Sequence, residues 1–319
     1  CGGVEVEVIF TAPLLMDDLA LLSRPVNYLT WQVRAVDEAE HDVQLYLEAT
    51  PQFAVDDLSQ PVVSETGSGE GIDFVRTGTV EQNILGKKGD NVRIDWGYFY
   101  LATPSGKGKI ALADYYDSKE AFTASGTLPE GAQSIRTENM LKEPVALAYA
   151  NDLGKVGADA VCDYVLLGYD DLYSIQYFGE NLRPYWNRTG ENDIRRELKA
   201  AADTYNATLD RCETFDREMM QATEEAGGRS YAELCALAYR QAIAAHKLVE
   251  SPQGELLWLS KENFSNGSIG TVDISYPSAP LFLLYNPELV KGMLNHIFYY
   301  SESGKWTKPF AAHDVGTYP

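Results

Sequence analysis

The sequence predicts an antiparallel β-sandwich that is followed by helical hairpins joined by long loops. Up to about residue 170, apolar and polar residues alternate with a period of two, which is typical of half-buried strands. After about residue 193, apolar residues recur every three to four positions, which is typical of amphipathic helices. We therefore expect a β-sandwich domain over residues 1–170 and a helical domain over residues 171–319.

Several short strands separated by turns favour the sandwich over other β folds. Alternation is clearest at residues 4–10, 43–48 and 92–96, and one short helix is expected near residues 118–124. The turn clusters between these segments are Asp37–Glu40, Gly67–Gly71, Gly86–Asn91, Pro104–Gly108 and Pro129–Gly131. Many strands with such turns are typical of a two-sheet sandwich. The aromatic segment 170–186 is expected to pack between the two domains.

The helical part carries start and stop signals for three helices. A long amphipathic helix is predicted from residue 193 to 226, where the two glycines at 227–228 end it. Ser230 and Glu233 have the spacing of a capping box for a second helix, which runs to about Val249 and is apolar nearly all round. Asn286-Pro287-Glu288 begins a helix that ends near Tyr300.

Composition excludes some classes of function. The chain has 319 residues, of which 45% are hydrophobic, and a formal net charge of −21. That charge argues against nucleic-acid binding, which needs clustered Lys and Arg. No apolar run approaches the ~20 residues of a membrane-spanning helix. We therefore expect a small-molecule substrate, no nucleic-acid partner and no membrane-spanning segment.

The sequence contains no pattern typical of a cofactor site or of an activated nucleophile. The four cysteines, at positions 1, 162, 212 and 235, match no zinc or redox spacing, and Cys212 and Cys235 are expected to be small buried residues. There is no His-x-x-x-His pair and no calcium-loop pattern, so we expect no metal and no cofactor. His246 is predicted to be a structural histidine in a helix.

One polar stretch, residues 260–280, is the strongest candidate for chemistry. It is rich in Gly, Ser and Pro, is expected to be a loop, and holds charged and amide side chains close together. With the cluster at residues 313–316, it supplies carboxylates and a histidine for acid–base work. The hypothesis assigns acid and base to Glu262, Asp273 and Asp314, and substrate binding to Lys261, Asn263, Tyr276 and His313. The alternative is that these residues only cap loops and pair with one another.

Six segments carry a resemblance to a known family across nearly the whole chain. They are residues 10–15 (FTAPLL), 22–28 (LSRPVNY), 238–242 (AYRQA), 260–265 (SKENFS), 276–280 (YPSAP) and 308–314 (KPFAAHD). In these segments the chain resembles bacterial relatives of the fungal glutaminase A proteins. The resemblance implies an N-terminal β-sandwich followed by an (α/α)6 toroid of six helical hairpins. It also implies a secreted or periplasmic location and hydrolysis of L-glutamine to glutamate and ammonia, or of a related small polar substrate.

The resemblance also implies that this chain is a fragment. The sandwich is expected to be truncated at its N-terminus, and residues 171–319 are expected to form only the first part of the toroid. Two other functions stay open. One is a glycoside hydrolase of the (α/α)6 type, which would use paired carboxylates on a carbohydrate. The other is a non-catalytic carbohydrate-binding protein.

Overall fold

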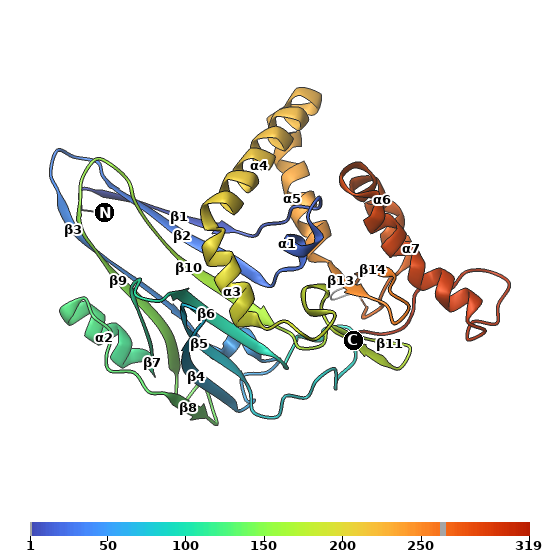
Figure 1. Cartoon of the computed structure of the whole chain (residues 1–319), viewed down its shortest axis with the longest axis horizontal. Coiled ribbons are helices and arrows are strands. Elements are labelled where there is room, and N and C mark those ends of the chain that lie inside the picture. The colour runs from blue at the N-terminus through green and yellow to red at the C-terminus, as the bar shows by residue number, and fades with distance from the viewer. Residues whose placement is uncertain (1, 262–265) are drawn as a thin grey trace.

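Two antiparallel sheets form the first part of the molecule, and helices dominate the second part (Figure 1). The computed structural model describes residues 2–261 and 266–319. The strands of the larger sheet are, in spatial order, β1 (Val4–Thr11), β2 (Val26–Ala35), β10 (Val161–Asp170), β6 (Tyr98–Pro104), β5 (Ile72–Thr79), β4 (Val62–Gly69) and β8 (Ser134–Thr137). Those of the smaller sheet are β3 (His41–Ala49), β9 (Val145–Val156) and β7 (Lys109–Asp114).

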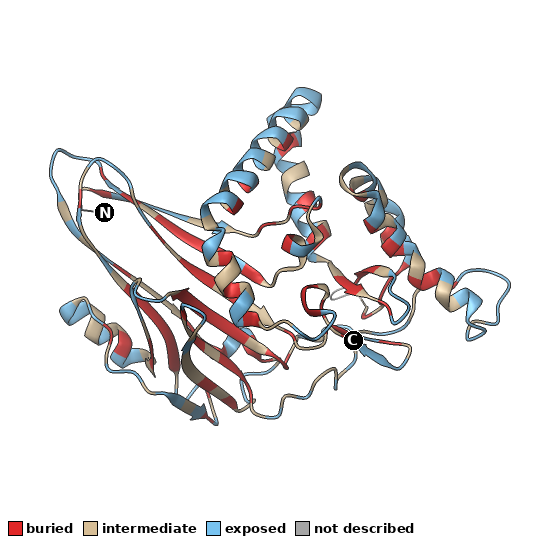
Figure 2. Ribbon diagram, in the orientation of Figure 1, coloured by how far each residue is buried: buried red, intermediate tan, exposed pale blue. Residues whose placement is uncertain are grey.

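The core of the sandwich lies between these two sheets. Leu101 of the larger sheet and Leu112 and Leu147 of the smaller sheet belong to one buried cluster and have no solvent exposure. The rings of Trp31 and Tyr149 stack across the two sheets with centroids 6.0 Å apart. The predicted β-sandwich is therefore confirmed, and Figure 2 shows buried residues running along its strands.

Two of the three alternating segments are strands, and one is not. Residues 4–10 and 43–48 lie in β1 and β3. In β1 only Val4 is buried, and Phe10 is 65% exposed, because β1 is an edge strand of the larger sheet. Residues 92–96 were expected to form a strand, but the structure gives them none. Instead the indole of Trp96 is buried and donates to the carbonyl oxygens of Asp171 and Tyr173, each at 2.9 Å.

The expected helix at residues 193–226 is two helices, α3 (Ile194–Asp203) and α4 (Tyr205–Gly227), which meet at Thr204. Leu198 of α3 is fully buried against the outer face of the larger sheet. Tyr205 stacks on Tyr164 of that sheet with ring centroids 3.8 Å apart. The predicted single helix is therefore interrupted near the end of its contact with the sheet, and α4 then points away from the sheet (Figure 1).

The second predicted helix differs from expectation at both ends. It is α5 (Arg229–Ala244), its N-cap is Gly228 with φ 82°, and no side chain caps it. Ser230 lies inside the helix, so the predicted capping box is wrong; Glu233 pairs instead with Arg229 at 2.9 Å. Residues 246–249 belong to a strand, and Leu234 and Leu237 on α5 are more than half exposed.

The polar stretch at residues 260–280 is not one loop. A hairpin of β13 (His246–Glu250) and β14 (Leu256–Ser260) precedes it, and its second half lies in α6 (Val272–Tyr285). Pro277 and Pro280 lie within α6. The last helix, α7 (Pro287–Glu302), begins and ends as predicted, and packs against β14 and α6. The remaining elements are α1 (Leu19–Ser23), the predicted short helix α2 (Tyr115–Ser125), β11 (Ile175–Tyr177), β12 (Glu180–Leu182), and the 3-10 turns Pro51–Ala54 and Tyr185–Asn187.

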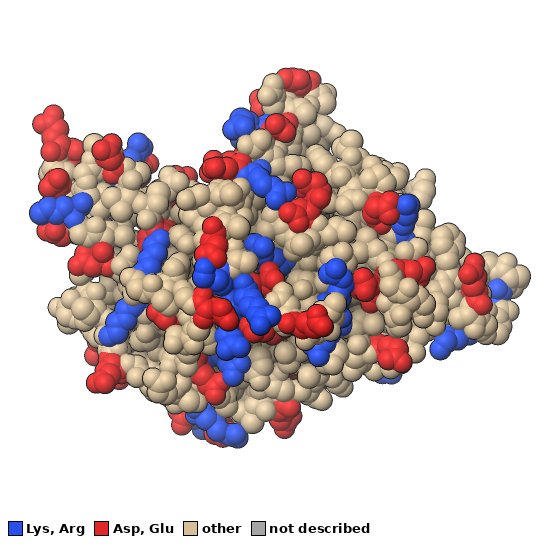
Figure 3. Space-filling model, viewed as in Figure 1, with Lys and Arg blue, Asp and Glu red and all other residues tan. Residues whose placement is uncertain are grey.

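The surface carries charges of both signs. On the face shown in Figure 3, acidic and basic side chains are interspersed, and that face has no broad basic track. Among the described residues, no helix is both long and apolar enough to cross a membrane.

The start of α7 supports a stability prediction. The side chain of Asn286 accepts a hydrogen bond from the Glu288 amide and donates to the Met16 carbonyl oxygen at 2.7 Å. Asn286→Ala removes both contacts, so we expect the free energy of unfolding to fall by about 1–2 kcal/mol. Urea denaturation measures it. Ser301→Ala, at an exposed position in the last turn of α7, is the control and should cost less than about 0.5 kcal/mol; equal losses in the two variants would contradict the prediction.

Candidate functional site

The structure brings three of the predicted site residues into direct contact. Asp273 lies in the first turn of α6, and His313 and Asp314 lie in the segment after α7. The Nε2 atom of His313 is 2.9 Å from Oδ1 of Asp273, and its Nδ1 atom is 2.8 Å from Oδ2 of Asp314. One imidazole ring therefore lies between two carboxylates that are distant in sequence.

Backbone hydrogen bonds hold these two segments together. The Val272 amide donates to the His313 carbonyl at 2.9 Å, and the Val315 amide donates to the Ile269 carbonyl at 3.0 Å. The Gly316 amide donates to Oδ1 of Asp314 at 2.8 Å. Both oxygens of Asp314 are thus engaged, which fixes the carboxylate against the Nδ1 side of His313.

The cluster is open to solvent, but its three side chains differ in how exposed they are. The side chains of Asp273 and His313 are 67% and 61% exposed, whereas that of Asp314 is 26% exposed. Each ring nitrogen of His313 therefore has a carboxylate oxygen within hydrogen-bond distance, and the less exposed one, that of Asp314, lies on the Nδ1 side. Displacement of the exposed Asp273 carboxylate would free Nε2 to exchange a proton with a bound molecule, while Asp314 keeps the ring oriented.

The other predicted residues are placed differently. Tyr276 projects from α6 with 84% exposure. Lys261 forms a bridge with Ile269 and lines a cavity on the side of the β13–β14 hairpin. Glu262 and Asn263 lie outside the described residues, so their predicted roles stay predictions.

The cavity beside Lys261 has a volume of about 350 Å³ and lies between the two parts of the fold. Its walls include Tyr169, Asp171 and Ser174, which follow or end β10, and His246 and Lys247 from β13. Asp273, His313 and Asp314 are not among the described residues that line it. The cavity and the cluster are neighbours through Ile269, which lines the cavity and is hydrogen-bonded to Val315.

Asp171 is a buried carboxylate in the wall of this cavity. It is 6% exposed, and its Oδ2 atom accepts from Ser174 Oγ at 2.6 Å and from Lys247 Nζ at 2.7 Å. Its other oxygen, Oδ1, has no hydrogen-bond partner among the residues that the structure describes. A buried carboxylate oxygen without a partner is costly in a folded protein.

His246 is the second unusual group of this wall. It is not in a helix, as predicted, but at the start of β13, where its ring stacks on Trp258 with centroids 5.0 Å apart. Its Nδ1 atom donates to the Ala242 carbonyl at 2.6 Å, and burial lowers its pKa to about 4. The ring is therefore neutral at pH 7, with Nε2 as an acceptor that has no partner in the described part of the chain.

The sequence hypothesis included Lys261 but missed Asp171 and His246. The adjacent acids Asp170 and Asp171, at the start of the aromatic segment expected to pack between the two domains, were a weak signal, because acids are common in this chain. The partner Lys247 comes from a distant segment, so no local pattern indicates the pair. No group of three acidic, Cys or His side chains among the described residues has a geometry that could hold a metal ion.

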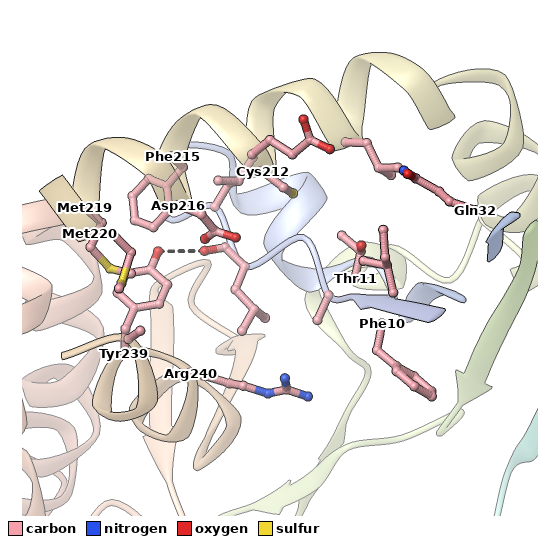
Figure 4. Close-up of a pocket in the computed structure, with 17 residues that line it drawn as sticks. Phe10, Thr11, Gln32, Cys212, Phe215, Asp216, Met219, Met220, Tyr239 and Arg240 are labelled. Carbon is pink, nitrogen blue, oxygen red and sulfur yellow. Dashed lines mark hydrogen bonds between the residues drawn. The ribbon is translucent and has the colours of Figure 1, made fainter. Parts of the chain in front are cut away.

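A second cavity, of about 410 Å³, lies between β1, α4 and α5 (Figure 4). Figure 4 shows Met219 and Tyr239 at one end and Gln32 at the other. Burial raises the pKa of the Cys212 thiol in its wall to about 11, so this cysteine is the small buried residue that was predicted. Cys235 was predicted to be buried too, but it is only partly buried. None of the described residues around this cavity carries a buried polar atom that lacks a partner.

Two family matches cover almost the whole chain. Residues 1–222 match the family described as "Domain of unknown function (DUF5127)", and residues 228–319 match "Glutaminase A six helical-hairpin domain". The helical part is thus part of a six-hairpin α/α toroid, as the family resemblance implied.

Two curated relatives and one solved structure show similarity. Glutaminase A of Aspergillus oryzae is 27% identical over 321 residues, which are 99% of this chain and 46% of that protein. A protein named as a probable glutaminase from Arthroderma benhamiae is 20% identical over 337 residues, 99% of this chain and 38% of that protein. A structure named as a kojibiose phosphorylase from human microbiome has a TM-score of 0.37 at 10% identity, over 76% of this chain and 25% of that chain, which is too weak to carry an argument.

The chain spans less than half the length of these two curated relatives. The first family match alone covers more than half of its residues. With a β-sandwich, a helical part that matches the six-hairpin domain, and similarity to Glutaminase A along its whole length, this chain belongs to the glutaminase A family.

Proposed function

We propose that the protein is a hydrolase of small polar amides, with L-glutamine as substrate, and that His313 is its proton-transfer group. The contact of one imidazole with Asp273 and Asp314 carries the proposal. The names of two relatives support the choice of amide. The secreted or periplasmic location that the resemblance implies stays a prediction.

Amide hydrolysis needs a proton removed from water and a proton delivered to the leaving nitrogen. One histidine can perform both steps in turn, as base and then as acid. Asp314 would hold the ring and stabilise the imidazolium, since its Oδ2 atom contacts Nδ1. The carboxylate of Asp273 would move away from Nε2 of His313 when substrate or water binds there, because the Asp273 side chain is exposed. One glutamine and one water are consumed, the C–N bond of the side-chain amide is broken, and the products are glutamate and ammonia.

The test is turnover of L-glutamine by the full-length protein, followed as ammonia release. We expect His313→Gln and Asp314→Asn to lower kcat by about 100-fold or more, because positioned acid–base groups contribute at least that much. The matched control is His41→Gln. His41 also contacts an aspartate, Asp37, at 2.9 Å, but it lies in the sandwich. Unchanged kcat in both site variants, with unfolding temperatures equal to that of the parent, would rule out the proposal.

The paired-carboxylate alternative has one observation in its favour. Asp273 and Asp314 lie on opposite sides of a single ring, so they are two acids of different exposure in one cluster. A glycoside hydrolase needs two such groups with separate roles. Release of reducing sugar from a panel of glycosides, lost in Asp273→Asn and Asp314→Asn, would favour this function over amide hydrolysis.

A further inference from the structure

We infer that the cavity between β10 and the β13–β14 hairpin binds the zwitterionic end of an α-amino acid, with the ammonium group at Asp171 and the carboxylate at Lys261. The inference rests on the proposed function only for the choice of glutamine as the amino acid. The volume of about 350 Å³ is that of a small-molecule site.

The Asp171 side of the cavity selects a cationic donor. The Oδ2 atom is held by Ser174 and Lys247, and the backbone carbonyl of Asp171 accepts from the buried indole of Trp96. The carboxylate is therefore fixed in position, while Oδ1 has no partner among the described residues. A ligand ammonium supplies the donor that this oxygen lacks.

His246 adds a neutral acceptor to the same wall. Its Nδ1 atom is committed to the Ala242 carbonyl, which leaves Nε2 able only to accept. Two acceptors without partners among the described residues, one charged and one neutral, suit an amino group with several N–H bonds. They do not suit a ligand that presents only acceptors, such as phosphate or a carboxylate.

Lys261 supplies the opposite charge from another element. Its amide donates to the Ala245 carbonyl at 2.9 Å, and its ammonium group lies 4.8 Å from the ring centroid of Tyr318. Burial lowers the pKa of this lysine, which shows that its ammonium group is partly removed from water. Lys261 lines the same cavity, so an anionic ligand group there can pair with its ammonium group. The third charged residue of the wall, Lys247, is already paired with Asp171, so the cavity offers a ligand one oxygen of Asp171 and the cation of Lys261, which matches the two charges of a zwitterion.

The segment that leads from the cavity to His313 is short. Ile269 lines the cavity, and its backbone is bonded to Val315 and Gly316, directly after Asp314. An amino acid anchored at its charged end would place its side chain away from Asp171 and Lys261. The backbone hydrogen bonds of Ile269 join this cavity to the segment that carries His313 and Asp314.

Calorimetric titration of the full-length His313→Gln protein with L-glutamine tests the inference, because this variant should bind without turning over. We expect Asp171→Asn and Lys261→Gln each to weaken binding by about tenfold or more. Asp95→Asn is the matched control. Asp95 is 1% exposed, pairs with Lys87 at 2.7 Å and has a partnerless oxygen among the described atoms, but it does not line the cavity.

Ligand analogues identify which charge meets which residue. The glutamine analogue without its α-amino group should bind about tenfold more weakly than glutamine, and Asp171→Asn should not weaken it further. The analogue without a free carboxylate should behave in the same way toward Lys261→Gln. Losses that add instead of overlapping would overturn the assignment.

The outcomes separate this inference from the proposed function. If the protein hydrolyses glutamine and the Asp171 and Lys261 variants keep its KM, the inference is wrong and the proposed function stands. If the protein binds glutamine through these two residues but releases no ammonia, the proposed function is wrong and the binding site stands. If the His313→Gln protein does not bind glutamine at millimolar concentration, the inference is wrong.

Discussion

Trp258→Ala is expected to lower the free energy of unfolding by about 3–5 kcal/mol, the usual cost of deleting a large buried aromatic side chain. Trp258 lies in β14 and is 2% exposed. Its ring contacts His246 in the hairpin and Phe282 in α6, and α7 approaches its backbone so closely at Gly292 that a Cβ there would lie 2.9 Å from the Trp258 nitrogen. The indole therefore packs between the hairpin and α6, while the backbone of Trp258 lies against α7.

The loss should come from packing alone. The Nε1 atom of Trp258 has no hydrogen-bond partner among the described atoms, so Trp258→Phe should recover most of the stability. Trp306→Ala is the control, because Trp306 is only partly buried in the segment after α7, and it should cost less than about 1 kcal/mol. Scanning calorimetry measures all three; an unchanged transition in Trp258→Ala would show that the hairpin does not depend on this side chain.

The second large effect is a loss of stability in mild acid. Burial lowers the pKa of His246 from 6.5 to about 4 and also lowers the pKa of the fully buried His296. Between pH 4 and pH 6.5, His246 is mostly protonated in the unfolded chain and mostly neutral in the folded chain, so the unfolded chain binds more protons. The contribution of His246 is therefore complete above pH 6.5 and is lost as the pH falls toward 4, by about 3 kcal/mol in all. His296 adds to the loss in the same direction.

Urea denaturation from pH 7 to pH 4 measures this dependence. His246→Phe keeps a ring against Trp258 but cannot take a proton, so its stability should fall less steeply over that range. A parent slope that His246→Phe does not alter would mean that the imidazole of His246 is protonated equally in the folded and unfolded chains.

Patterns among neighbouring residues were enough to predict the start of α7 and the strands of the sandwich. The start of α7 was predictable because it depends only on neighbouring residues, Asn286, Pro287 and Glu288. The Asn286 side chain accepts a hydrogen bond from the Glu288 amide, two positions along the chain. The sandwich was predictable because alternation is repeated in many strands. The capping box predicted at Ser230 was wrong because a capping box needs an extended residue at the N-cap position. The N-cap of α5 is Gly228, two residues earlier, so Ser230 lies inside the helix.

Long-range contacts explain what the sequence did not predict. Pro277 and Pro280 favoured a loop, yet α6 persists because Phe282 is fully buried against its neighbours. For the site, residue type and loop context were enough to select Asp273, His313 and Asp314, although their catalytic role stays a prediction. The approach of Asp171 to Lys247 depends on how the sandwich meets the hairpin, and no sequence pattern encodes that.

The cavity has a wall from each of the two matched segments. Asp171 belongs to the segment of residues 1–222, and Lys247 and Lys261 belong to residues 228–319. Two polypeptides made by cutting the chain between these segments would each lack one charge of the proposed amino-acid site. Recovery of binding at that proposed site, after the two pieces are mixed, would report that they have reassembled.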